Sequence, residues 1–144
     1  MRAPFQVIVF PYHFESGELQ VLIGRRKDNH YWQAISGGGE NDESAIAAAQ
    51  RELQEEASLT GINWLKLDSL CTLPKVHYVG HEAWLENEFV IPEHAFMVEV
   101  TGRVVCSEEH SELRWCSIKD AESLLKYDSN KNALWEVVQR TRTQ

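Results

Sequence analysis

The chain has 144 residues, with 14 Lys or Arg and 22 Asp or Glu, so its formal net charge at pH 7 is −8. A composition of 43% hydrophobic and 25% charged residues excludes a disordered, collagen-like or coiled-coil protein. No stretch approaches the roughly 20 apolar residues of a membrane span, and the acidity argues against a nucleic-acid partner. The length fits one domain. Three cysteines without a CxxC pair favour a reducing compartment, so we expect a cytoplasmic protein.

Apolar periodicity and turn residues predict the secondary structure in chain order. We expect early strands at 5–10, 19–23 and 31–35, with a turn at 15–18. A helix is expected over 44–58, capped by Asn41 or Asp42. Later strands are expected at 63–71, at 83–91 and 95–100 as a pair around Pro92, and at 113–116, followed by helices at 118–126 and 131–140. This alternation predicts an α/β domain with a mixed sheet between helices.

The strongest chemical signal is an acidic stretch on the expected helix, Arg51-Glu52-Leu53-Gln54-Glu55-Glu56. At about 100° per residue, its three glutamates share an arc of roughly 100°. Their repulsion opposes the helix, and a bound Mg²⁺ or Mn²⁺ would remove it, because these ions take carboxylate oxygens. Arg51 stands four residues before Glu55 and can hold that carboxylate. The alternative interpretation is a solvated acidic helix face.

The stretch belongs to a longer pattern that resembles the Nudix box. Gly37, Glu43 and the acidic stretch match the box over 23 positions, with six of its seven fixed residue types present. The departure is Ser58, where the family has a glycine that ends the helix, and we expect Gly61 to take over that role. Segments 108–115 and 121–134 are similar to later parts of Nudix proteins, the second to the dihydroneopterin triphosphate and dATP pyrophosphohydrolase branch. The resemblance implies one Nudix domain over 1–144, a Nudix-type α/β/α sandwich with a mixed β-sheet.

The resemblance also implies a chemistry, the metal-dependent hydrolysis of a diphosphate bridge in a nucleoside-diphosphate-linked compound. The implied ligands of Mg²⁺ or Mn²⁺ are Glu52, Glu55, Glu56 and the carbonyl of Ser36. Glu43 is implied to support the geometry between the glycines and the helix. The catalytic carboxylates are expected among Glu52, Glu55, Glu109 and Glu112. The general base is either a box glutamate, matching Glu52, or a late-loop one, matching Glu109 or Glu112.

The expected substrate is a small-molecule nucleotide, and the tail favours a nucleoside or pterin triphosphate. The expected substrate-binding residues are Gly37, Gly38 and Gly39, which let the backbone approach phosphates, together with Arg25 and Arg26. Pro74 stands 15 residues after Leu59, a placement associated with ADP-ribose hydrolases.

Two further readings remain open. One is a Nudix module that senses nucleotides without hydrolysis. The other is an isoprenyl diphosphate isomerase, for which Cys71 would be the nucleophile. The sequence does not specify an oligomeric state.

Overall fold

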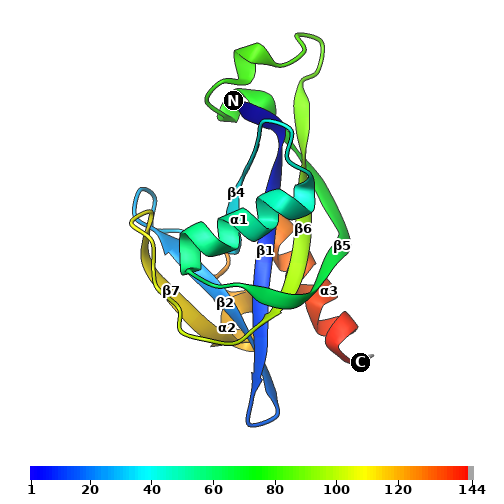
Figure 1. Ribbon diagram of the computed structural model, residues 1–144. Helices are drawn as coiled ribbons and strands as arrows, with labels where there is room; N and C mark the ends of the chain where they lie inside the picture. The colour runs from blue at the N-terminus through cyan, green and yellow to red at the C-terminus, as the bar shows by residue number, and fades with distance from the viewer. Residues whose placement is uncertain (143–144) are drawn as a thin grey trace.

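A computed structural model describes residues 1–142, which form one seven-stranded sheet with helices on its faces (Figure 1). The strands are β1 (Arg2–Glu15), β2 (Glu18–Arg26), β3 (Trp32–Gln33), β4 (Ile35–Glu40), β5 (Gly61–Pro74), β6 (Val90–Val100) and β7 (His110–Ser117). The helices are α1 (Ala45–Ala57), α2 (Ile118–Leu124) and α3 (Asp128–Arg142), with 3-10 turns η1 (Lys75–His77) and η2 (His81–Ala83). No helix within these residues is both long and apolar enough to cross a membrane.

The helices lie on both faces of the sheet, α1 on one and α2 and α3 on the other (Figure 1). Alternate residues of β1 serve the two faces: Val7 and Val9 pack in the core beneath α1, whereas Ile8 and Phe10 pack in the core that contains residues of α2 and α3. Two covered faces explain why residues 7–10 of β1 form an unbroken apolar run. The sheet is mixed, because β1 is parallel to β6 and antiparallel to β2 and β4. The expected α/β/α sandwich is therefore confirmed.

The expected hairpin turn at 15–18 is also confirmed. Ser16 and Gly17 both have positive φ, 50° and 80°, as a two-residue hairpin loop of the favoured hand requires.

The glycine run lies in a strand. Gly37, Gly38 and Gly39 belong to β4, which pairs antiparallel with β1. A Cβ at Gly37 would overlap the Glu52 carboxylate. At Gly38 it would overlap the Arg2 guanidinium, and at Gly39 the Phe5 ring. These glycines leave space for side chains that cross the strand, and two of those side chains reach the site described below.

The strand pair expected around Pro92 is wrong. Residues 84–89 form no strand, and β6 runs without a break through Pro92. Pro92 is paired with Thr72 on β5, while the ladder between β6 and β1 begins one residue later, at Glu93. The proline therefore stands where β6 has a neighbour on one side only, a position that tolerates its missing N–H.

Both ends of α1 differ from the expectation. Ser44 caps the start, and its hydroxyl accepts a hydrogen bond from the Ala47 N–H (3.2 Å), so neither Asn41 nor Asp42 is the cap. Ser58 ends the helix itself in the left-handed conformation (φ 57°, ψ 36°). Gly61 takes no part in this C-cap and instead begins β5. A serine here adopts the backbone conformation that glycine adopts at lower cost.

Candidate active site

Arg51 connects the glycine strand to α1. Its guanidinium donates two hydrogen bonds to the carboxylate of Glu43, both 2.9 Å, and one to the carbonyl of Gly38, 2.8 Å. The expected support by Glu43 is confirmed, since Glu43 also accepts from the Glu40 N–H (2.9 Å). Arg51 further contacts Glu55 at 3.2 Å, as expected. This bidentate, charge-assisted arrangement fixes the entry to α1.

Two of the three glutamates in the acidic stretch of α1 are buried, so the solvated-face interpretation is wrong for them. Glu52 is 7% and Glu56 4% exposed. Burial raises the pKa of Glu52 to about 7, although Arg51 opposes the shift through a 2.9 Å ion pair. Glu55 is the exposed member, with 55% of its side chain accessible. Buried carboxylates require a charged or hydrogen-bonding partner.

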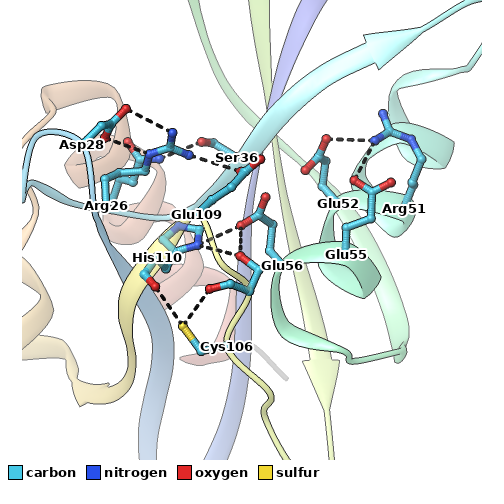
Figure 2. Close-up of polar contacts among 12 residues, drawn as sticks. Arg26, Asp28, Ser36, Arg51, Glu52, Glu55, Glu56, Cys106, Glu109 and His110 are labelled. Atoms are coloured by element: carbon cyan, nitrogen blue, oxygen red, sulfur yellow. Dashed lines mark hydrogen bonds and ion pairs between the residues drawn. The ribbon is translucent and has the colours of Figure 1, made fainter.

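Glu56 finds its partners at the start of β7 and in the segment just before it (Figure 2). Its Oε2 lies 2.8 Å from Nδ1 of His110 and accepts a 3.0 Å hydrogen bond from the Ser107 hydroxyl. Burial raises the pKa of Glu56, but these hydrogen bonds outweigh it, and the pKa lies below its ordinary value. Glu109 is adjacent, and a hydrogen bond with Glu56 raises the Glu109 pKa. The late segment is thus joined to the box helix.

The carboxylates of Glu52, Glu55, Glu56 and Glu109 line a cavity of about 590 Å³, which also borders β4 through Ser36, Gly37 and Gly38. Six carboxylates but only three guanidinium groups line it: Asp28, Glu40, Glu52, Glu55, Glu56 and Glu109, against Arg2, Arg26 and Arg51. An anionic diphosphate would be repelled by this excess of negative charge unless cations accompanied it.

The cavity brings together most of the predicted site residues and leaves out three. Its lining includes, of the predicted set, Arg26, Ser36, Gly37, Gly38, Glu52, Glu55, Glu56 and Glu109. Gly39 faces Phe5 instead. Glu112 pairs with Arg114 at 2.9 Å, and neither Glu112 nor Arg25 lines the cavity.

Sequence reasoning missed several residues that complete the site. Arg2 lies over the Tyr78 ring, 5.2 Å from its centroid, and both line the cavity with His77 and Gln6. The Nε of Arg2 is buried and has no hydrogen-bond partner within residues 1–142. His110 was part of a recognised segment but had no role assigned. No local pattern marks these residues, because Arg2 and Tyr78 are brought together only by the fold.

The donor set suits a hard divalent cation. Three carboxylates on one helix supply the oxygen ligands that Mg²⁺ and Mn²⁺ take, and the cavity has an excess of negative charge. As the side chains stand, Glu52 and Glu55 turn towards Arg51, whereas Glu56 turns towards His110 (Figure 2). Accordingly, no three carboxylate, imidazole or thiol groups among residues 1–142 converge closely enough to hold a metal. Arg51 and His110 occupy carboxylate oxygens that a metal would take.

The isomerase reading is not supported by the surroundings of Cys71. Cys71 does not line the glutamate cavity. Burial and the nearby Glu93 raise the pKa of its thiol to about 11. A thiol that stays protonated near neutral pH is a poor nucleophile.

Comparison with known proteins places the chain in a family. The NUDIX domain model matches residues 4–139, so the chain belongs to the NUDIX family. It is 29% identical over 125 residues to Nudix hydrolase 13, mitochondrial, of Arabidopsis thaliana. That match covers 83% of this chain but 59% of the relative, so the chain spans somewhat over half of that protein's length.

Solved structures of NUDIX proteins have a similar fold. A Listeria monocytogenes protein described as a NUDIX hydrolase superposes with a TM-score of 0.85 at 36% identity, over 98% of this chain and 96% of that one. The Escherichia coli dihydroneopterin triphosphate pyrophosphohydrolase has a TM-score of 0.73 at 22% identity, over 96% and 97% of the two chains. The second likeness concerns the fold alone.

Proposed function

We propose that the chain is a pyrophosphohydrolase that acts, with bound Mg²⁺ or Mn²⁺, on the diphosphate bridge of a nucleoside or pterin triphosphate, with residues 1–144 acting as one Nudix domain. The observation that carries the proposal is the burial of Glu52 and Glu56 in a cavity with six carboxylates and three guanidinium groups. Cations bound by these carboxylates would neutralise the diphosphate and lower the pKa of the attacking water.

The residues that line the cavity have separate roles, some binding the metal and others the phosphates. We assign Glu52, Glu55 and Glu56 as metal ligands, with the carbonyl of Ser36 as a further oxygen. Arg2 and Arg26 are the cavity cations that we assign to phosphate oxygens, and the unpaired Nε of Arg2 supports this role. Gly37 and Gly38 contribute a strand backbone without Cβ atoms. Arg51 positions α1, and we assign the contacts with substrate to Arg2 and Arg26.

The general base in this proposal is a glutamate that faces the cavity. Glu109 lines the cavity, contacts Arg26 at 3.4 Å and lies beside Glu56. Glu112 has Arg114 as its partner and does not line the cavity. We therefore favour Glu109 over Glu112, with Glu52 as the box alternative. A base must come within hydrogen-bond reach of the water that it activates.

We keep the cytoplasm as the expected location, and the support is that Cys71, Cys106 and Cys116 are all free thiols. The substrate and the ion are tested directly by assaying phosphate and pyrophosphate release with Mg²⁺, Mn²⁺ or chelator. The panel comprises nucleoside triphosphates, dihydroneopterin triphosphate, diadenosine polyphosphates and ADP-ribose. We expect hydrolysis of a triphosphate only with added metal.

The decisive variant is Glu52→Gln, which keeps the side chain's size and an acceptor for Arg51. We expect a loss of about 10³-fold or more in rate, as removal of one such metal role costs several kcal/mol of barrier. Folding should not suffer, because one of three like charges on α1 is removed. Glu122→Gln makes the same charge change at an exposed position of α2 and should leave the rate unchanged. A near wild-type rate for Glu52→Gln would overturn the proposal. Binding of nucleotides without turnover would favour the sensor reading instead.

A further inference from the structure

A buried carboxylate outside the glutamate cavity has an unfilled hydrogen-bonding capacity. Glu93 on β6 is 9% exposed. Its single hydrogen-bond donor within residues 1–142 is the thiol of Cys71, at 3.4 Å from Oε1. A thiol is a weak donor, and a buried carboxylate can accept about four hydrogen bonds. Such a group is costly to bury unless stronger donors reach it.

Glu93 lies where two further cavities meet. One, of about 240 Å³, shares Gln6, Gln33, Ser36, His77 and Tyr78 with the glutamate cavity. The other, of about 260 Å³, contains Cys71. Glu93, Ile8 and Ser129 line both. The shared lining makes one path that leads from the glutamates to Glu93, so a ligand with its phosphates among the glutamates can extend to this carboxylate.

The walls of the path suit a flat heterocycle. Tyr78 and Tyr127 both line the cavity of about 240 Å³, and aromatic faces pack on planar rings. Ile8 supplies an apolar surface shared by both cavities. Polar groups line the same cavity, among them Gln33, Ser129 and Asn130, and placed polar groups of this kind set the specificity of a small-molecule site.

We propose that Glu93 selects ligands whose heterocycle presents a ring N–H beside an exocyclic amino group, the 2-amino-4-oxopyrimidine edge of guanine and of pterins. A carboxylate accepts two parallel N–H bonds from such an edge. Adenine and cytosine place a ring acceptor beside the amino group, and that acceptor would face the carboxylate. Uracil and thymine offer one N–H between two carbonyl groups. This inference rests on the proposed function, because it names the substrate class of the same path.

The test compares substrates that differ in the hydrogen-bond donors on the edge of the base. For the metal-loaded wild-type protein we expect kcat/KM to fall from GTP to ITP, which lacks the 2-amino group, and further to ATP. The loss from GTP to ATP should be at least tenfold, since a buried acceptor without its donor is penalised. Equal kcat/KM for the three substrates would overturn the inference while leaving the proposed function intact.

The variant Glu93→Gln changes the pattern of donors and acceptors with little change of size. An amide presents one acceptor and one donor, which matches the amino and ring-acceptor edge of adenine and mismatches the ring N–H and 2-amino edge of guanine. We expect the ratio of kcat/KM for GTP over ATP to fall at least tenfold. The matched control is Glu99→Gln on the same strand, where the glutamate is paired with Asn63 (3.3 Å); its ratio should be unchanged. A loss of activity shared equally by all substrates in Glu93→Gln would contradict the inference.

A binding measurement tests the base preference assigned to Glu93 separately from the proposed hydrolysis. Calorimetric titration of guanosine, inosine and adenosine into the protein requires no hydrolysis. Guanosine should bind most tightly to the wild type, and Glu93→Gln should lose that preference. If guanosine is preferred but the protein hydrolyses no substrate of the panel, the role of Glu93 is supported and the proposed function is overturned. Binding without a base preference would overturn the role of Glu93.

Discussion

The Nδ1 atom of His110 lies 2.8 Å from Oε2 of Glu56, and 1% and 5% of these side chains are exposed. The pair joins the first residue of β7 to the last turn of α1. Ser107 strengthens the connection through its own hydrogen bond to Glu56. Because His110 is anchored in this way, its neighbour Glu109 is held at the cavity beside the box glutamates.

Replacement of His110 by leucine should destabilise the metal-free protein. His110→Leu leaves the buried carboxylate of Glu56 without its closest partner, and loss of a hydrogen-bond partner by a buried polar group costs about 1–3 kcal/mol, more for a charged group. Urea unfolding at pH 7 measures the loss. The double variant His110→Leu, Glu56→Gln should be less destabilised than the sum of the two single variants, because no unpaired charge remains. Unchanged stability of His110→Leu would show that the pair contributes little.

The two late glutamates should behave differently. Glu109→Gln should lower kcat by about 10²-fold or more, as expected for loss of a general base. Glu112→Gln is the matched control and should change kcat less than twofold, because Glu112 pairs with Arg114 away from the cavity. Steady-state kinetics on the best substrate decide the matter. Wild-type kcat in Glu109→Gln would move the base to Glu52 or leave activation to the metal.

Glu136 on α3 should make stability depend on acid pH. Its carboxylate accepts hydrogen bonds from the backbone N–H groups of Asp68 (2.7 Å) and Ser69 (2.8 Å) and from Arg140 (2.7 Å). Burial raises the pKa of Glu136, but these donors outweigh it and lower the pKa from 4.5 to about 2. The unfolded chain therefore binds the proton more tightly. The stabilisation is complete above about pH 4.5 and is lost as the pH falls towards 2.

The variant Glu136→Gln tests this dependence. At pH 7 we expect it to lose about 1–2 kcal/mol of unfolding free energy, after allowance for solvent screening of a partly exposed group. The difference from wild type should shrink below pH 4.5 and disappear near pH 2. Urea unfolding between pH 2 and pH 7 provides the measurement, with Glu122→Gln as the control. A constant difference over this range would contradict the assignment.

Ser58→Gly should stabilise the protein. Ser58 is exposed and holds φ at 57°, where glycine pays no penalty for a Cβ atom. We expect a gain of up to about 1 kcal/mol, reduced by the greater freedom of glycine in the unfolded chain. Ser58→Ala retains the Cβ atom and should give no gain. Thermal unfolding of the two variants decides, and equal melting temperatures would reject the explanation.

The sequence by itself determined the parts that depend on local geometry. The spacing of Glu52, Glu55 and Glu56 predicts their shared helix face, because a helix repeats its direction every few residues. The match of Gly37, Glu43 and Arg51 to the box identified the family without any structure. The β-rich, apolar stretch at 5–10 predicted a buried strand.

Only the tertiary structure decided which residues meet across long separations. Arg2 reaches the cavity through the space above Gly38, and Tyr78 lies beneath its guanidinium. Neither contact leaves a periodic or compositional trace, because the partners lie in distant segments. Likewise, Pro92 suggested a break between two strands until the sheet showed that β6 has one neighbour at that point. The box glutamates could be read as a solvated face because charge alone does not determine burial. Packing of the 107–110 segment against α1 buried Glu56, and hydrogen bonds from His110 and Ser107 offset the cost of removing its charge from water.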